Sequence, residues 1–341
     1  MQKEVTIYDI AERLGVTAST VSRGLNNSPR VTKKTRDEIH KTATEMGYQH
    51  NTIASNLRKR QTKTIGVIVH RLDSYFITCV LTGIEKIINK AHYDILIMNS
   101  AESGVREVAN AKSLLNKRVD GVIVSLALNT KNIDHFTPFL DRKIPVIFFD
   151  RVMPEVNCTK VIIDNFSSGY EATAHLIAGG RKRIAHITAD LQRNVYKERF
   201  LGYKRALNDN GIIYKEKLVK ICNAEKSEIV EAVEQLLKQK PDAFFVMNDF
   251  SAAICIQVLH KKGFKVPEDI AVMGFNNDIL GDLVVPKLST LDYPGELMGE
   301  IAATELINQM SLKHNRENIV DKTIVIPSEI IIRESTLKLN P

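Results

Sequence analysis

The sequence predicts a two-lobed α/β core, built of parallel sheets flanked by helices, behind a small all-α head that contains a helix-turn-helix. Three observations predict this fold. The 341 residues suffice for two or three domains. Residues 1–63 carry a net charge of +6, whereas the rest of the chain carries +1. After Lys63 the pattern changes abruptly, from apolar residues at helical spacing to apolar runs that alternate with amphipathic stretches.

The first predicted element is a short helix that starts after Thr6, a residue type that favours the N-cap position. Asp9 follows three residues later, as in a capping box. Apolar residues then recur at i, i+3, i+4 and i+7, which places them on one face of a helix: Ile7, Ile10, Ala11 and Leu14. Gly15 is expected to end this helix.

A second helix is predicted directly after Thr17, with Val21 and Leu25 pointing inward. A turn at 26–29 follows, and a third helix runs from Thr32 to the glycine at 47, with its buried face made of Ile39, Ala43 and Met46. The unit is too small to contain a deep cleft. Its second helix carries small polar residues and one arginine outward, which suits a helix lying in the major groove of DNA.

The outward residues of this unit predict the kind of contact each makes with DNA. Arg23 can donate two bonds to a guanine, Ser19 can bond a base edge, and Ala18 can contact a thymine methyl. The hydroxyls of Thr20 and Ser22 would bond phosphates. The full set of DNA-binding candidates in the head is Thr6, Thr17, Ala18, Ser19, Thr20, Ser22, Arg23 and Arg30. A protein-binding three-helix module is the alternative.

These residues carry a family resemblance. The motifs are TIYDIA at 6–11, GVT at 15–17, TVSR at 20–23 and LN at 25–26, continued in register at Val31, Thr35-Arg36 and Gly47-Tyr48. They resemble the N-terminal headpiece of the lactose-repressor (LacI/GalR) family of bacterial transcription regulators. Two residues depart from the family pattern: His50 stands where proline is usual, and Gly24 stands where alanine or valine is usual. Glycine within a helix lowers its stability by about 1 kcal/mol relative to alanine.

Residues 50–63 form a short segment with its own pattern. Asn51 can cap about two turns of helix with a small apolar stripe, and Arg58-Lys59-Arg60 follow. So short a helix is marginal alone. The resemblance implies that it is the family's hinge helix, with Leu57 as the wedge in the minor groove and with Ile53 and Ala54 in the contact between two hinges. Asn51, Ala54 and Leu57 complete the DNA-binding candidates; a flexible basic linker is the alternative.

The remainder of the chain, 64–341, predicts repeated strand–helix units. Apolar runs at 65–69, 95–98, 119–124, 145–149 and 161–163 read as strands, as do 183–188, 243–247 and 270–275. Amphipathic helices lie between them, as at 75–91 and 251–261. Such alternation predicts parallel sheets covered by helices on both faces. None of the glycine-rich phosphate, nucleophile-elbow or histidine–metal motifs is present, so we expect no catalytic residues.

The family resemblance extends through this core. Matching stretches include IGVI at 65–68, VDGVI at 119–123, RIAHI at 183–187 and RFLGY at 199–203. It resembles the family's effector-binding core, which is similar to periplasmic sugar-binding proteins. The resemblance implies interleaved lobes: lobe 1 takes about 64–162 plus 292–323, and lobe 2 takes about 163–291 plus 324–341.

Ligands of such sheets bind beyond the carboxyl ends of the strands, here in the cleft between the lobes. The resemblance places three residues in this cleft. Asp150 can accept hydrogen bonds from sugar hydroxyls, Arg199 can donate two hydrogen bonds, and Asn248 can both donate and accept. The full set of effector-binding candidates is Tyr75, Phe76, Asp150, Lys197, Arg199, Asn248 and Asn276. Many family members have aspartate where Asn276 stands. Lys197 and Arg199 together would also tolerate an acidic ligand. The alternatives are a surface ion pair for Asp150-Arg151, a helix cap for Asn248 and ordinary core positions for Tyr75 and Phe76.

Composition also limits the protein class. No apolar run approaches the ~18 residues of a membrane span, and the N-terminus has no secretory pattern. The four cysteines are far apart and form no CxxC pair. We therefore expect a cytoplasmic protein, at the bacterial nucleoid when bound to DNA, with no membrane partner, metal or other cofactor.

The sequence thus predicts a DNA-binding transcription regulator, a repressor in the commoner arrangement of the family. It would bind a pseudo-palindromic double-stranded operator as a homodimer and respond to a small effector, a sugar or sugar derivative. A sugar-binding transport protein would need a signal peptide and no basic head. An enzyme acting on a sugar or nucleotide would turn its ligand over, whereas a regulator returns it unchanged.

Overall fold

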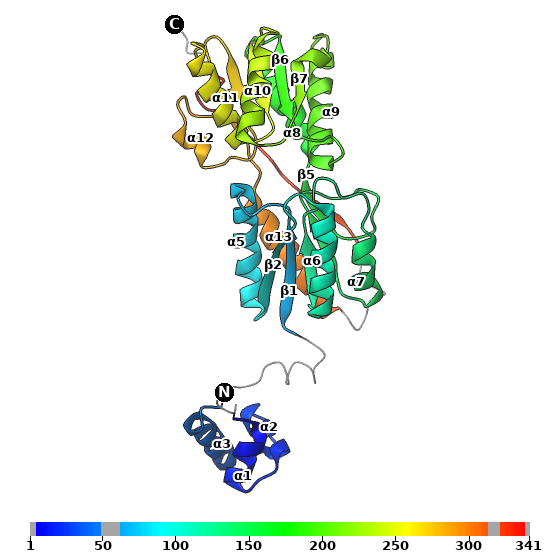
Figure 1. The fold of residues 1–341 in the computed structure, drawn as a ribbon, viewed down its shortest axis with the longest axis vertical. Helices are drawn as coiled ribbons and strands as arrows, with labels where there is room; N and C mark the ends of the chain where they lie inside the picture. Colours follow the sequence, from blue (N-terminus) through cyan, green and yellow to red (C-terminus); the bar gives the residue numbers. More distant parts are fainter. Residues whose placement is uncertain (1–4, 49–61, 313–320, 338–341) are drawn as a thin grey trace. The chain divides into compact units, whose positions relative to one another are not determined.

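The computed structural model describes residues 5–48, 62–312 and 321–337. The chain divides into two compact units, Met1–Thr62 and Lys63–Pro341. Figure 1 draws both units. None of the helices among the described residues is long and apolar enough to cross a membrane.

The head contains α1 (Ile7–Leu14), α2 (Ala18–Leu25) and α3 (Lys33–Glu45), which confirms the predicted helix-turn-helix and its supporting helix. The Asp9 carboxylate accepts hydrogen bonds from the Thr6 amide and hydroxyl, at 2.7 and 2.6 Å. Gly15 ends α1 with a φ of 63°, a conformation that glycine adopts without steric cost. The centre of the head is formed by Ile10, Val21 and Ile39, all without exposed surface.

Packing explains why a glycine stands at position 24, although glycine has a low helix propensity. It is buried where α2 meets α3, and a Cβ atom placed there would lie 2.5 Å from the Cδ1 atom of Ile39. A larger residue would require the Ile39 side chain to shift. The glycine therefore allows the close approach of the two helices.

Lobe 1 is a parallel six-stranded sheet in the order β11-β5-β4-β3-β1-β2. Its strands are β1 (Thr64–Val69), β2 (Asp94–Asn99), β3 (Gly121–Val124), β4 (Val146–Phe149), β5 (Lys160–Ile163) and β11 (Thr323–Ile326). Its helices are α5 (Tyr75–Lys90), α6 (Gly104–Asn116), α7 (Thr137–Asp141) and α13 (Gly295–Ser311), with a 3-10 turn, η1 (Asp134–Phe136). β1, β3 and β4 are almost wholly buried, as expected for parallel strands covered on both faces.

Lobe 2 is a parallel four-stranded sheet in the order β7-β6-β8-β9. Its strands are β6 (Ile184–Thr188), β7 (Val219–Ile221), β8 (Ala243–Val246) and β9 (Ala271–Met273). Its helices are α8 (Asn165–Ala178), α9 (Asn194–Asp209), α10 (Lys226–Leu237), α11 (Asp249–Lys261) and α12 (Leu280–Leu283), with a 3-10 turn, η2 (Glu216–Leu218). Figure 1 shows two separate lobes, each made of a sheet flanked by helices, and the chain segments that cross between them. The parallel α/β core predicted from the sequence is confirmed.

The chain crosses between the lobes after β5, between β10 (Thr290–Leu291) and α13, and between β11 and β12 (Ile330–Ile331). β10 and β12 pair antiparallel. The third crossing differs from the expected division at 323/324, because β11 continues in the lobe 1 sheet to Ile326. The pairing of Ile324 with Val161 and of Ile326 with Ile163 extends the sheet to that point.

Each lobe contains a helix pair that packs through glycines. In lobe 1, Gly83 of α5 and Gly299 of α13 lie against the backbone of the other helix, and a Cβ at either would come within 2.1 Å of a carbonyl oxygen. In lobe 2, Gly169 of α8 and Gly202 of α9 have the same role, at 2.3 and 2.2 Å. These glycines let the helix backbones touch and place α9, which carries Arg199, directly on α8.

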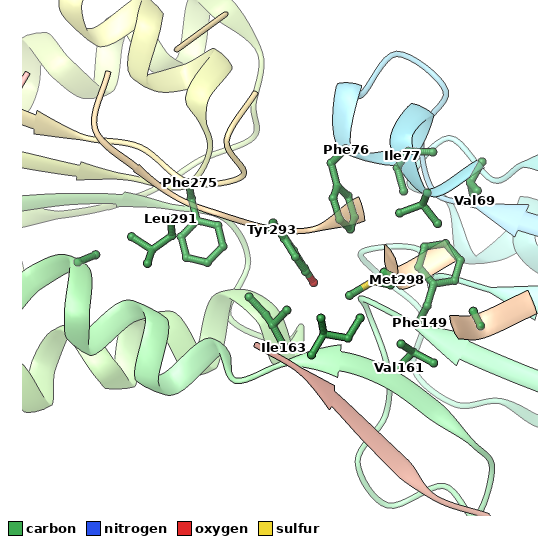
Figure 2. Close-up of a cluster of buried hydrophobic side chains, with 14 of the residues drawn as sticks. Val69, Phe76, Ile77, Phe149, Val161, Ile163, Phe275, Leu291, Tyr293 and Met298 are labelled. Atoms are coloured by element: carbon green, nitrogen blue, oxygen red, sulfur yellow. The ribbon is translucent and has the colours of Figure 1, made fainter. Parts of the chain in front are cut away.

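Buried apolar side chains continue from one lobe into the other. Figure 2 shows Phe275 and Leu291 of lobe 2 on one side and Phe76 and Phe149 of lobe 1 on the other. Tyr293, on the crossing segment that leads to α13, lies between them and is only 4% exposed. The hydrophobic core therefore joins the lobes at the crossing segments.

Candidate functional site

The outer surface of α2 carries the residues proposed to read DNA. Ser19 and Arg23, four residues apart, are both exposed on one face, while Val21 and Gly24 point into the head. Ala18, Thr20 and Ser22 are half-buried beside them. A short helix with one long cation and small neighbours can approach a base edge closely.

Three further candidates of the head serve the helix ends or the surface. The Thr17 hydroxyl accepts a hydrogen bond from the Thr20 amide at 3.2 Å and lies 2.9 Å from the hydroxyls of Ser19 and Thr20. Thr6 is exposed and is bonded to Asp9, and Arg30 is exposed. Thr6 and Thr17 are the N-cap residues of α1 and α2 and fix where these helices begin. The amide groups at a helix N-terminus can bind phosphate.

Tyr8 was missed as a candidate. It is 71% exposed on α1, and a phenol at such a position can bond a phosphate. The available signal was its place off the apolar stripe, since a core tyrosine would lie in register with Ile7, Ile10 and Leu14. The hinge candidates Asn51, Ala54 and Leu57 lie outside the described residues.

A cavity of about 890 Å³ lies between the two lobes. Residues that follow β1, β4, β8 and β9 line it, so it opens at the carboxyl ends of the strands of both sheets. The structure brings together these residues from the predicted set: Tyr75, Phe76, Asp150, Arg199, Asn248 and Asn276. Lys197 is exposed on α9 and is not among the lining residues, because it lies two positions from Arg199 and so faces another direction on the helix.

Asp150 is a buried acceptor held by its neighbours. It directly follows β4 and has a φ of 56°, which aspartate tolerates better than most residues. One carboxylate oxygen accepts from the Tyr293 hydroxyl at 2.7 Å, and the other accepts from the Ser125 hydroxyl at 3.1 Å. Burial raises the pKa of Asp150, while Arg151, Tyr293 and Arg199 oppose the rise. The two hydrogen bonds fix the orientation of this carboxylate in the wall of the cavity.

Arg199 is a buried cation placed over an aromatic ring. Its Nε donates to the side-chain oxygen of Asn165 at 2.8 Å, and Nη1 reaches the Met247 carbonyl oxygen at 3.4 Å. The guanidinium carbon lies 3.5 Å from the centre of the Phe275 ring. Burial lowers the pKa of Arg199 from its ordinary value, although the group stays charged near neutral pH. A planar donor so positioned can bind hydroxyls of a ligand lying in the cavity.

Asn248 and Asn276 edge the cavity from lobe 2. The Asn248 side-chain oxygen accepts from the Ser251 amide at 2.8 Å and caps α11, so the structure assigns it a capping role in addition to its place in the lining. Asn276 has a φ of 109°, and its backbone N–H donates to the Leu291 carbonyl oxygen at 2.9 Å. Asp249 supports this loop by accepting from the Asp278 amide, and burial raises the pKa of Asp249 to about 7.

Sequence reasoning missed Tyr293 and the group formed by Arg151, Glu102 and Tyr196. The Tyr293 ring stacks on Phe76 with centroids 4.3 Å apart. Arg151 donates to Glu102 at 2.6 Å and to the Tyr196 hydroxyl at 3.1 Å. All four line the cavity. Their separation along the chain left no local signal, apart from the Asp150-Arg151 pair itself.

His70, Ser125 and Asp150 form a chain of hydrogen bonds with the serine in the middle. The His70 Nδ1 lies 3.0 Å from the Ser125 hydroxyl, which in turn donates to Asp150. A nucleophilic triad requires the histidine between the serine and the acid. Ser125 is also fully buried. The arrangement orients Asp150 and lacks the order of a catalytic triad. Among the described residues, no cluster of three His, Cys, Asp or Glu could hold a metal ion.

Comparison with known proteins assigns both units. Residues 6–51 match the family model of bacterial regulatory proteins of the lacI family, and residues 173–336 match a periplasmic binding protein-like domain. The regulator NtdR of the NTD biosynthesis operon of Bacillus subtilis is 32% identical over 97% of this chain and 99% of its own length.

Two solved structures are similar over nearly the whole chain. The transcriptional regulator CelR in complex with cellobiose is 27% identical, with a TM-score of 0.72, and the match covers 97% of this chain and all of that one. The lac repressor dimer bound to operator and the anti-inducer ONPF shares the fold, with a TM-score of 0.87 at 23% identity over 98% of this chain and all of that one.

A helix-turn-helix head followed by a two-lobed core with a cavity between the lobes defines a class of DNA-binding transcription regulators. With a relative 32% identical over almost its full length, the chain belongs to the lacI family of bacterial regulatory proteins.

Proposed function

We propose that the protein is a transcriptional repressor that binds a pseudo-palindromic DNA operator as a homodimer and is controlled by a small sugar or sugar derivative. The observation that carries the proposal is the cavity between the lobes, in which Asp150, Arg199 and Asn248 present an acceptor, a donor and an amide to one ligand. A chain with both a DNA-reading head and such a cavity is suited to couple the two binding events.

The DNA-binding part of the proposal is supported by charge and by the surface of α2. The first 63 residues carry +6, which favours association with a polyanion. Arg23 supplies a bidentate donor for guanine, and Ser19 on the same face supplies a hydroxyl. The predicted hinge residues Asn51, Ala54 and Leu57 remain part of the proposal on sequence grounds alone.

The effector class is supported by the chemistry of the cavity lining. Hydroxyl-rich ligands need planar donors and carboxylate acceptors for their edges, and aromatic rings for their apolar faces. Arg199 supplies the planar donor and Asp150 the carboxylate acceptor, and Tyr75 and Phe76 supply the aromatic rings. CelR, which is 27% identical, was solved with cellobiose. Lys197 does not line the cavity, so one of the two cations predicted to tolerate an acidic ligand lies outside it.

The homodimer is supported by apolar side chains exposed on lobe 1. Ile97 is 44% exposed on β2, the edge strand of the sheet, and Val105 and Val108 of α6 are 82% and 47% exposed. Large apolar side chains gathered at a sheet edge favour association. A second copy of the chain would also present a second head, as a two-fold symmetric operator requires.

Control follows from the difference in affinity of the ligand for two arrangements of the lobes. A ligand that contacts Asp150 on lobe 1 and Arg199 on lobe 2 favours the arrangement that brings both to it. DNA binding changes in the same proportion if the head favours the other arrangement. The protein would act in the cytoplasm, where the DNA is, and release its ligand chemically unchanged.

Selection of the full-length protein on a random duplex-DNA pool, followed by a salt series on the enriched sequences, tests the proposal. We expect a pseudo-palindrome with half-sites about one helical turn apart and steeply salt-dependent binding. The enriched duplex then serves as the probe in a screen of neutral mono- and disaccharides for release. Enrichment of no sequence, with and without these sugars, would contradict the regulator; conversion of a sugar to product would favour an enzyme.

A further inference from the structure

The start of α9 is bonded to lobe 1, although the helix belongs to lobe 2. Arg193 donates from Nε to the Leu128 carbonyl oxygen at 2.9 Å and from Nη2 to the Thr130 carbonyl oxygen. Asn194 donates to the Asp150 carbonyl oxygen and accepts from the Val152 amide, both at 3.0 Å. We call these four contacts the α9 seam.

The seam is buried and lies outside the cavity lining. Arg193 and Asn194 are 3% and 6% exposed, and neither is among the residues that line the cavity. Their partners Leu128 and Asp150 do line it. Arg193 and Asn194 therefore bind the backbone of two residues that line the cavity, Leu128 and Asp150. Their side chains can change the shape of the cavity without contacting a ligand in it.

Hydrogen bonds within lobe 1 hold the lobe 1 side of the seam. The Leu128 amide donates to the Glu102 carboxylate at 3.1 Å, and the Ala127 amide donates to the buried Glu107 at 2.6 Å. Glu107 is further bonded to Thr130 and His135. Because both acids are anchored in lobe 1, the loop at 126–130 cannot follow α9 freely. Relative movement of the lobes must then break the seam rather than bend the loop.

Two terms of opposite sign act on the seam, the carbonyl hydrogen bonds of Arg193 and the cost of burying its guanidinium. Arg193 is buried against neutral carbonyl oxygens, and no carboxylate among the described residues lies within ion-pair distance of it. Burial of a guanidinium is costly, and burial lowers the pKa of Arg193 from its ordinary value. On separation of the lobes, the carbonyl bonds are lost and the guanidinium regains water. Because the regained hydration of Arg193 offsets part of the lost hydrogen bonding, this contact between the lobes is suited to break and form again.

We propose that Arg193 and Asn194 are positioning residues that hold the two lobes together through the α9 seam, and that the seam opens as one unit when the lobes rearrange. The proposal rests on the proposed function only in assigning that rearrangement to effector control. The opening itself is a property of the protein without DNA or ligand.

Site-resolved hydrogen–deuterium exchange of the full-length protein, without DNA or ligand, tests the seam. The reporter is the Val152 amide, whose acceptor is Asn194. In Arg193→Ala this acceptor is untouched, so faster exchange at Val152 requires the two halves of the seam to open together. We expect at least a tenfold increase at Val152 in Arg193→Ala and an intermediate increase in Arg193→Lys, because an ammonium cannot reproduce the fork of a guanidinium.

Arg181→Ala is the matched control. Arg181 is also buried and also donates to two carbonyl oxygens, those of Pro267 and Asp269, but within lobe 2. We expect no change at Val152 in this variant. Unchanged exchange at Val152 in Arg193→Ala would overturn the proposal. So would an equal increase at the central strand amide of Ile123, since that would indicate a global loss of stability.

A second measurement connects the seam to regulation. On the duplex enriched by selection, the Kd of Arg193→Ala should differ from that of the wild type by at least threefold, while that of Arg181→Ala should not. An equal Kd would remove the seam from regulation. If the wild type enriches no duplex, the regulator proposal fails, and the exchange result still decides whether the seam exists.

Discussion

The face of α2 and the cavity between the lobes are built in opposite ways. The α2 face takes Ser19 and Arg23 from one turn of one helix, and both are exposed. The cavity takes Asp150 from the end of β4, Arg199 from α9 and Tyr293 from a crossing segment, and all three are buried. A surface that must meet DNA is prepared by local helix geometry, whereas a site that must enclose a ligand needs a tertiary fold.

The difference predicts how each site fails. Substitutions on α2 should change DNA binding and leave stability nearly unaltered, because exposed side chains contribute little to folding. Substitutions around the cavity should affect both binding and stability, because the lining side chains are bonded to one another.

Gly169→Ala should have the largest effect. The new Cβ would lie 2.3 Å from the Arg199 carbonyl oxygen, so α8 and α9 must separate. We expect a loss of about 3 kcal/mol in the free energy of unfolding, measured in urea, together with weaker ligand binding. Gly281→Ala is the control, since its Cβ meets nothing closer than 3.5 Å. Equal stability of the two variants would contradict the close packing of α8 on α9.

Arg199→Ala should abolish the response to ligand while DNA binding without ligand remains. Loss of a charged hydrogen-bond donor weakens binding by about 1.5–3 kcal/mol, or roughly 10- to 150-fold in Kd. Calorimetry with the sugar found in the screen measures this effect. Lys197→Ala, at an exposed position of the same helix, should leave the Kd unchanged. If the ligand still released the Arg199→Ala protein from DNA, Arg199 would not be in the site.

Arg23→Ala should weaken binding to the selected duplex by about 1–3 kcal/mol and relax the base choice at one position. Competition against duplexes altered at single positions measures both changes. Arg13→Ala is the control, because Arg13 is on α1 and pairs with Glu45 at 3.4 Å. An equal loss of affinity for random DNA would argue against base reading by Arg23, and any large loss of stability would contradict the contrast between the two sites.

Ser19→Ala should have the smallest effect, a loss of about 0.5–1.5 kcal/mol on the selected duplex, because it removes a single neutral hydroxyl. The melting temperature should stay within the error of the measurement, since Ser19 is exposed. Thr44→Ala, at an exposed position of α3, should leave the Kd for the same duplex unchanged. Unchanged affinity in Ser19→Ala would leave Arg23 to carry the base contact on this face.

Prediction from the sequence succeeded where neighbouring residues decide the structure. The ends of α1 at Thr6 and Gly15, and the inward positions of Val21 and Ile39, follow from capping and helical spacing. Among the effector-binding candidates, Lys197 does not line the cavity, and helix geometry explains why: residues two positions apart on a helix point in different directions, and Arg199 faces the cavity.

The order of the elements, the fold of the head and the two-lobed α/β class can be predicted from the amino-acid sequence, because they depend on periodicity, capping and the burial of parallel strands. Which distant residues meet depends on the packing of the folded chain. It placed Tyr293 on Asp150, Arg151 on Tyr196 and Arg193 on the Leu128 carbonyl. Such contacts depend on how two lobes pack, and no local pattern in the chain records the distance between residues that lie on different lobes.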